Sequence, residues 1–130
     1  MDRRTLLGLI GSQIVLAQPK QSSARPPVFT HDLPDLSLHN WAVTVVEVRY
    51  EPGQASNAHR HPGITLAYVL EGDIVSKVGD EAEKTYGTGE MWIEYPNALH
   101  AVSRNASKTK PARLLAVLLA EKGKPLTSPA

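Results

Sequence analysis

The sequence contains no cysteine, which excludes disulfide bonds, thiolate metal ligands and a cysteine nucleophile within these 130 residues. An excess of charge of one sign is also lacking: the formal net charge is +1 and Lys and Arg form no stripe, so nothing indicates a nucleic-acid partner. A serine nucleophile elbow, a glycine-rich phosphate loop and a dinucleotide fingerprint are missing too. The hydrophobic content of 42% is typical of a globular protein, and the length is that of one domain with a real core.

Residues 1–17 have the features of an export signal peptide. A positively charged start with Arg3 and Arg4 precedes an apolar run that ends at Ala17, where small residues predict cleavage. The run is too short to span a bilayer comfortably, so we expect no permanent membrane anchor. The prediction is a periplasmic or secreted protein, and the alternative is a cytosolic protein with a frayed N-terminal helix.

Turn-forming residues divide the rest of the chain into an arm, a barrel and a tail. Residues 18–40 predict an extended arm, and residues 121–130 predict a loose C-terminal tail. Residues 41–120 contain short runs of β-branched and aromatic residues separated by Gly, Pro or Asn, which is typical of an all-β sandwich or closed barrel. The expected strands are 41–50, 64–70, 74–78, 84–86, 91–95, 100–104 and 113–120. The last run is also compatible with a helix, but the all-β context favours a strand.

Two histidines, His59 and His61, stand two residues apart just before the strand expected at 64–70. Alternate side chains of an extended segment share a face, so both rings should project together. Neutral imidazole is the commonest protein metal ligand, and two on one face provide two ligands for one ion. His100 is the candidate for the third ligand. The alternative is a pair of surface histidines in a polar loop.

The spacing of these residues resembles the two sequence boxes of the cupin family. Gly53, His59, His61 and Gly72 follow the first box, and the separation of Gly89 from His100 follows the second. The resemblance implies a cupin-type double-stranded β-helix, the jelly-roll barrel also described as RmlC-like. In the second box, Tyr95 replaces the family's usual proline and Asn97 its usual glycine, and asparagine tolerates the same left-handed backbone.

Thr65 departs from the first box, where the family has a glutamate. By parity its side chain should face the same cavity as His59 and His61, but a threonine hydroxyl is a poor ligand for a divalent ion. We therefore expect Thr65 to hydrogen-bond a bound water or substrate, and we expect Thr65→Glu to tighten metal binding. The lost carboxylate is also compatible with a cupin that has lost its metal.

The predicted cofactor is one divalent transition-metal ion, with Fe, Zn, Ni and Cu all compatible with nitrogen ligands. His59, His61 and His100 are its predicted ligands, and no catalytic residue is assigned. The residues expected around the metal or substrate are Thr65, Glu94, Tyr68 and Trp92. For Glu94, a solvated position or an ion pair with Arg104 is an equal alternative.

The resemblance implies two functions that the sequence does not separate. One is a metal-dependent oxidoreductase of dioxygenase type, since the three-histidine set is similar to that of cupin dioxygenases. The other is a non-catalytic cupin that binds a small molecule as a sensor or carrier. A sugar-modifying epimerase fits less well because it does not need the full set of histidines. A homodimer is a further expectation, because residues 41–50 are apolar on both faces; the arm folding across one face is the alternative.

Overall fold

The computed structural model describes residues 25–130, so the predicted signal peptide and the start of the arm lie outside the described residues. The described chain is all-β, with strands β1 (Trp41–Tyr50), β2 (His59–Arg60), β3 (Ile64–Glu71), β4 (Ile74–Val78), β5 (Lys84–Tyr86), β6 (Met91–Glu94), β7 (Leu99–Asn105), β8 (Ala112–Glu121) and β9 (Ser128–Pro129). Within this part of the chain, no helix is long and apolar enough to cross a membrane.

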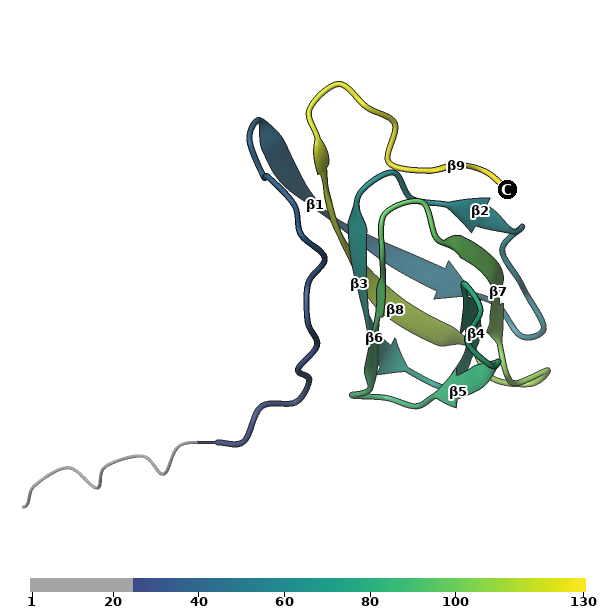
Figure 1. Cartoon of the computed structure of the whole chain (residues 1–130). Helices are drawn as coiled ribbons and strands as arrows, with labels where there is room; N and C mark the ends of the chain where they lie inside the picture. The colour runs from purple at the N-terminus through teal and green to yellow at the C-terminus, as the bar shows by residue number, and fades with distance from the viewer. Residues whose placement is uncertain (1–24) are drawn as a thin grey trace, which may run out of the picture.

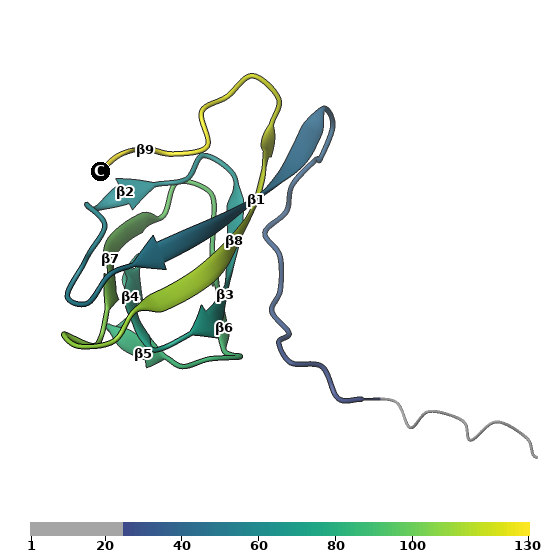
Figure 2. The ribbon, with the colours of Figure 1, turned by 180° about the vertical axis from the view of Figure 1, so that it is seen from behind.

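Two antiparallel sheets face each other and close into a barrel (Figure 1). The first sheet has the strand order β1-β8-β3-β6 and the second has the order β5-β4-β7-β2-β9. Seen from behind, the long strands β1 and β8 cross one side of the barrel (Figure 2). Most neighbouring strands are non-consecutive in the chain, as in a jelly roll, so the double-stranded β-helix expected from the sequence is confirmed.

The core lies between the sheets because strand residues alternate between the two faces. In β3, Ala67 and Val69 are buried, and they pack with Ile74 of β4, Trp92 of β6 and Leu114 of β8. The run at the end of the barrel is therefore a strand, as its context predicted, and tertiary packing overrides the helix propensity of its Leu and Ala residues.

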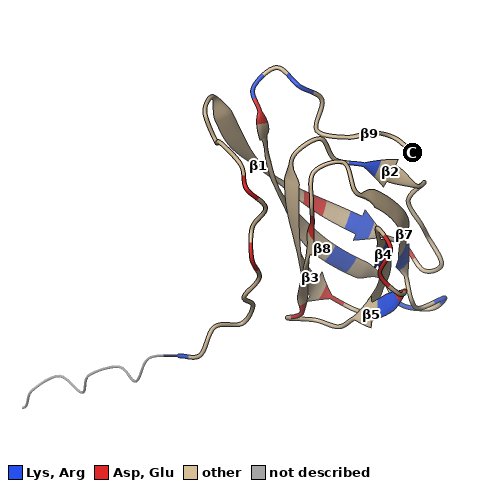
Figure 3. Cartoon of the chain, in the orientation of Figure 1, with Lys and Arg blue, Asp and Glu red and all other residues tan. Residues whose placement is uncertain are grey.

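Charged residues of both signs are spread along the ribbon (Figure 3). On the outer face of the first sheet, Arg113 donates hydrogen bonds to Glu71 at 2.7 Å and to Glu47 at 3.1 Å. These three side chains link neighbouring strands β1, β8 and β3. Because the group is solvent-exposed, screening keeps its contribution to stability small.

The described part of the arm runs along the outside of the barrel (Figures 1 and 2). Tyr95 fastens it by donating a hydrogen bond to the Asp32 carbonyl at 2.6 Å. Residues 25–40 nevertheless leave Val43 and Val45 of β1 63% and 57% exposed. The arm therefore does not shield the outer face of β1, and the homodimer stays a prediction.

The tail corrects a sequence expectation. Residues 128 and 129 form β9 and pair with β2, so Ser128 lies opposite Arg60 and Pro129 opposite His59. The Leu126 carbonyl accepts a hydrogen bond from the His61 ring at 2.8 Å. The expectation of a loose tail over residues 121–130 is therefore wrong for its last residues, which the polar and proline-rich composition did not reveal.

Candidate metal centre

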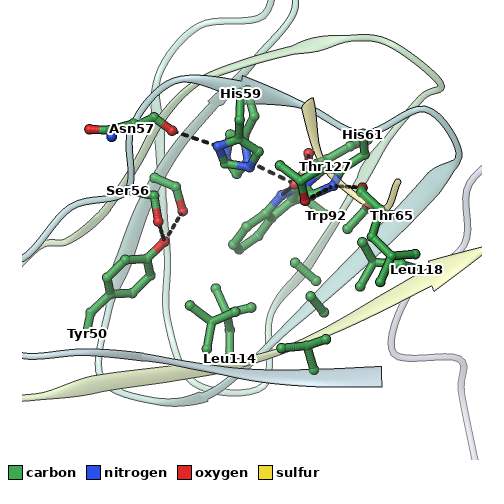
Figure 4. Close-up of a pocket in the computed structure, with 18 residues that line it drawn as sticks. Tyr50, Ser56, Asn57, His59, His61, Thr65, Trp92, Leu114, Leu118 and Thr127 are labelled. Atoms are coloured by element: carbon green, nitrogen blue, oxygen red, sulfur yellow. Dashed lines mark hydrogen bonds and ion pairs between the residues drawn. The ribbon is translucent and has the colours of Figure 1, made fainter. Parts of the chain in front are cut away.

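The three histidines expected from the sequence converge inside the barrel. Figure 4 shows two of them, His59 and His61, at the cavity. His59 lies in β2, His61 follows that strand directly, and His100 lies opposite His59 in β7. The ring centroid of His59 is 4.8 Å from that of His61 and 4.9 Å from that of His100. Parity in the extended chain brings the first two together, and the register of β2 with β7 brings in the third.

A fourth residue, Glu94 of β6, completes the cluster. One possible ligand atom from each of His59, His61, Glu94 and His100 can be chosen so that all four lie within 4.8 Å of one another. Two atoms bound to one ion at about 2.1 Å are at most about 4.2 Å apart, so small side-chain rotations would close the group on an ion. These four residues are called the His–Glu cluster below.

Backbone carbonyls set the tautomers of two of the histidines. The Asn57 carbonyl lies 2.7 Å from His59 Nδ1, and the Leu126 carbonyl lies 2.8 Å from His61 Nδ1. A carbonyl only accepts, so each Nδ1 carries the proton and each Nε2 keeps its lone pair for the cavity. This pattern is the one found in metal-ligating histidines.

The environment favours the metal-binding forms of His59 and Glu94. Burial lowers the pKa of His59, the Asn57 carbonyl acts to raise it, and the neighbouring His100 and His61 lower it further, so its net shift is downward. Burial acts to raise the pKa of Glu94, but the close contacts with His100, Trp92 and His61 outweigh burial and hold that pKa below its usual value. A carboxylate and a neutral imidazole are the forms that bind metals.

Three buried polar atoms at this point have no hydrogen-bond partner among the described residues: Thr65 Oγ1, Glu94 Oε2 and His100 Nδ1. His100 Nδ1 lies 3.1 Å from Glu94 Oε1, but at an angle that forms no proper hydrogen bond. Unpaired polar atoms are costly inside a protein, so three of them in one place fit a site that takes up a polar or charged group. The donor set of three imidazoles and one carboxylate fits a divalent transition metal.

A β-bulge in β7 turns His100 and Ser103 to the same, inward face, whereas regular alternation would place them on opposite faces. Ser76 of β4 pairs with Ser103, whereas Val78 pairs with His100, so β7 has one extra residue between the two pairs. His100 and Ser103 are each only 4% exposed although their positions differ by three, which in a regular strand would place them on opposite faces. Ser76 Oγ lies 2.8 Å from His100 Nε2 and holds the ring in place.

The residues expected around the metal divide into two groups. Thr65 and Trp92 line the cavity with the cluster, and Trp92 Nε1 donates a hydrogen bond to Glu94 Oε1 at 3.0 Å. Tyr68 is a correction: Thr65 and Ala67 face inward, so the alternation of β3 turns Tyr68 to the outer face, away from the cavity. Arg104 contacts Glu83 and leaves Glu94 to the cluster.

Glu94 lies within the cluster itself rather than around it. It ends β6 and is 2% exposed, so the expected alternative of a solvated glutamate is wrong. Its Cα lies directly opposite that of Thr65 in the pairing of β3 with β6. Position 65, where the first cupin box has a glutamate, thus has a carboxylate opposite it on the neighbouring strand. Sheet register, which one sequence does not reveal, was needed to find it.

The cavity beside the cluster has a volume of about 410 Å³. The apolar part of its lining comes from β1 and β8, with Val46, Val48, Leu114, Ala116 and Leu118. Figure 4 shows Leu114 and Leu118 among them. Leu126 and Thr127 of the tail line it as well, and their contribution had no signal in the sequence. A volume of this size suits a small molecule bound next to the cluster.

Comparisons with known proteins agree with this architecture. The family model described as a cupin domain matches residues 46–118. TT1209 from Thermus thermophilus is 31% identical over 75% of this chain and 90% of its own, with a TM-score of 0.55. A protein with a double-stranded β-helix domain from Klebsiella pneumoniae is 21% identical over 66% of this chain and 72% of its own, with a TM-score of 0.57.

The DMSP lyase DddQ from Ruegeria pomeroyi has a TM-score of 0.60. It is only 15% identical, over 68% of this chain, and the match spans 43% of the lyase, so the likeness shows the fold alone. No curated protein matches the chain.

Proposed function

The chain belongs to the cupin domain family, and from its His–Glu cluster we propose that it is a metal-dependent enzyme that acts on a small molecule inside the barrel. In this proposal His59, His61, Glu94 and His100 hold one divalent ion. The bound molecule lies between these residues and the apolar wall formed by β1 and β8.

One observation carries the proposal: three buried polar atoms that have no partner within residues 25–130 lie where two histidines present unprotonated nitrogens. A cation there would satisfy the orphaned atoms of Glu94 and His100. A divalent ion held by these residues supplies a Lewis acid for an oxygen of the bound molecule. With one carboxylate in the donor set, the loaded site keeps a net charge of +1, which favours an electron-rich oxygen donor as its ligand.

The surrounding residues have separate tasks. Trp92 fixes the orientation of Glu94 through its indole N–H, and Ser76 fixes that of His100. Thr65 Oγ1, buried without a partner among the described residues, is available to hydrogen-bond a bound molecule or water beside the cluster. The apolar wall excludes water from the other side, which strengthens electrostatic interactions inside the cavity.

The dioxygenase-type reaction expected from the sequence stays a prediction. Solved structures with similar folds include a DMSP lyase and an oxalate decarboxylase, at 15% and 21% identity. These likenesses support a fold that carries enzymes and do not select among their reactions. The identity of the bound metal would distinguish these reactions in part, because iron suits oxygen chemistry and zinc suits Lewis-acid chemistry.

Elemental analysis of the protein purified from its source tests the proposal. We expect about one equivalent of a divalent transition metal per chain, and iron together with oxygen consumption would support the dioxygenase. His59→Asn should lose the metal. His39→Asn, which changes a histidine outside the cluster, should keep it. A chain without metal that also fails to bind one equivalent in titration would contradict the proposal and favour a non-catalytic binding protein.

We further propose that the protein is exported and that its mature N-terminus is near Gln18. The paired arginines, the short apolar run and the small residues ending at Ala17 support this. Mass spectrometry of the protein from its source should find a chain without residues 1–17, and replacing Arg3 and Arg4 with Gln should keep the precursor uncleaved. An intact Met1 chain as the main species would contradict export.

A further inference from the structure

A cluster of three hydroxyl groups lies in the wall of the same cavity (Figure 4). Tyr50 Oη is 2.7 Å from Ser56 Oγ and 2.8 Å from Ser103 Oγ. Tyr50 and Ser103 are each 4% exposed, and the Ser56 N–H donates to the Ser103 carbonyl at 2.9 Å, which fixes the loop after β1 against β7. These three residues are called the hydroxyl cluster.

The hydroxyl cluster has one more hydroxyl proton than the hydrogen bonds within it require. Each hydroxyl can donate one hydrogen bond, and three hydroxyl protons serve only two hydrogen bonds within the cluster. Whichever way the two bonds are directed, one O–H remains unused, and these hydroxyls form no other hydrogen bond among residues 25–130. The cluster therefore has a donor to offer to a molecule in the cavity.

The cavity provides no partner for a charged group at this end. Among the described residues that line it, none is Lys or Arg, and the sole acid is Glu94, which contacts His61, Trp92 and His100. A carboxylate, phosphate or ammonium group placed at the hydroxyl cluster would lose its water without gaining a counter-charge. The group that fits there is neutral and carries an oxygen acceptor.

From these observations we propose that the hydroxyl cluster binds the distal end of the substrate. The substrate class is then a small molecule with a metal-binding oxygen group at one end, an apolar middle and a neutral hydroxyl or carbonyl at the other. Ser103 lies three residues beyond His100 in β7, roughly 7–10 Å along the strand, which a chain of a few carbons can span. This inference rests on the proposed metal site.

A series of hydroxamates tests the inference with zinc-loaded protein. All members have the same metal-binding hydroxamate head and a tail of four or five carbons that ends in methyl, hydroxyl or carboxylate. Because a neutral hydrogen bond has a modest net value, we expect the hydroxyl-ended probe to bind about fivefold more tightly than the methyl-ended one. The carboxylate-ended probe should bind at least about tenfold more weakly than the methyl-ended one. Isothermal titration calorimetry measures all three dissociation constants.

The variant Tyr50→Phe/Ser56→Ala/Ser103→Ala removes all three hydroxyls at once. Replacing every partner with an apolar group leaves none unsatisfied, so zinc affinity and binding of the methyl-ended probe should stay within about twofold. The preference for the hydroxyl-ended probe should disappear. If this variant does not fold, the ranking of the three probes on the unmodified protein still decides.

The outcomes distinguish the two proposals. If zinc does not bind, the proposed function fails. If zinc and hydroxamates bind but the three tails bind alike, or the carboxylate binds best, the metal site stands and the distal subsite is refuted. A hydroxyl preference that survives the triple variant would also overturn the assignment to these residues.

Discussion

Glu94→Gln is expected to lower the affinity of the protein for zinc by about 100-fold. The substitution removes the one carboxylate of the His–Glu cluster and its negative charge, while Trp92 can still donate to the amide oxygen of the new side chain. Competition with a chromophoric chelator measures the affinity. Glu83→Gln is the control, since this exposed glutamate contacts Arg104 at the surface and should leave zinc affinity unchanged.

Adding Thr65→Glu to the Glu94→Gln chain should recover at least about tenfold of the lost affinity. The two positions are directly opposite in the pairing of β3 with β6, and both side chains line the cavity, so a carboxylate at either can reach the cluster. In the unmodified chain, Thr65→Glu places a second carboxylate beside Glu94, so we expect a smaller gain there. If the double variant recovers no zinc affinity, a carboxylate at position 65 cannot take the place of the one at position 94.

Gly63→Ala is expected to destabilise the fold by about 3 kcal/mol, near the upper end of the usual cost of overpacking. A methyl group at this position would overlap the backbone carbonyl oxygen of Leu119 in β8, and a backbone atom cannot rotate away as a side chain can. The backbone movement that relieves this overlap should also displace His61, two residues earlier, and weaken zinc binding. Urea unfolding of the metal-free protein measures the loss of stability.

Gly87→Ala is the matched control for this substitution. Its added methyl group would meet only the Asp73 side chain, at 3.2 Å, and that carboxylate can move. We expect a change in unfolding free energy of less than about 1 kcal/mol. If Gly63→Ala lowers the unfolding free energy as little as this control, the segment after His61 does not approach β8 as closely as described.

The strands could be predicted because their residues carry local signals. Residues 41–50, 74–78 and 84–86 form strands with the predicted limits, and the other four expected strands differ by no more than one residue at either end. β-branched runs closed by Gly, Pro or Asn provide this information without any long-range contact. Asn97 adopts a φ of 61°, as its place in the turn predicted.

Features that depend on strand register or on distant contacts could not be predicted from the sequence. The convergence of His59, His61 and His100 followed from parity and family spacing, but the approach of Glu94 depends on which strand pairs with β3. β9 has only two residues, and it forms by pairing with the equally short β2 rather than from a pattern of its own. The outward position of Tyr68, in contrast, could have been predicted, because its parity in the strand places it on the face opposite that of Thr65.

The most direct test of the metal centre is anomalous diffraction from crystals of the cobalt- or zinc-loaded protein. The structure predicts one strong anomalous peak per chain inside the barrel, within bonding distance of His59, His61, Glu94 and His100, where bonds to nitrogen are about 2.0–2.1 Å for zinc. An ion found only at surface histidines such as His31 or His39, with the His–Glu cluster unchanged and empty, would contradict the account.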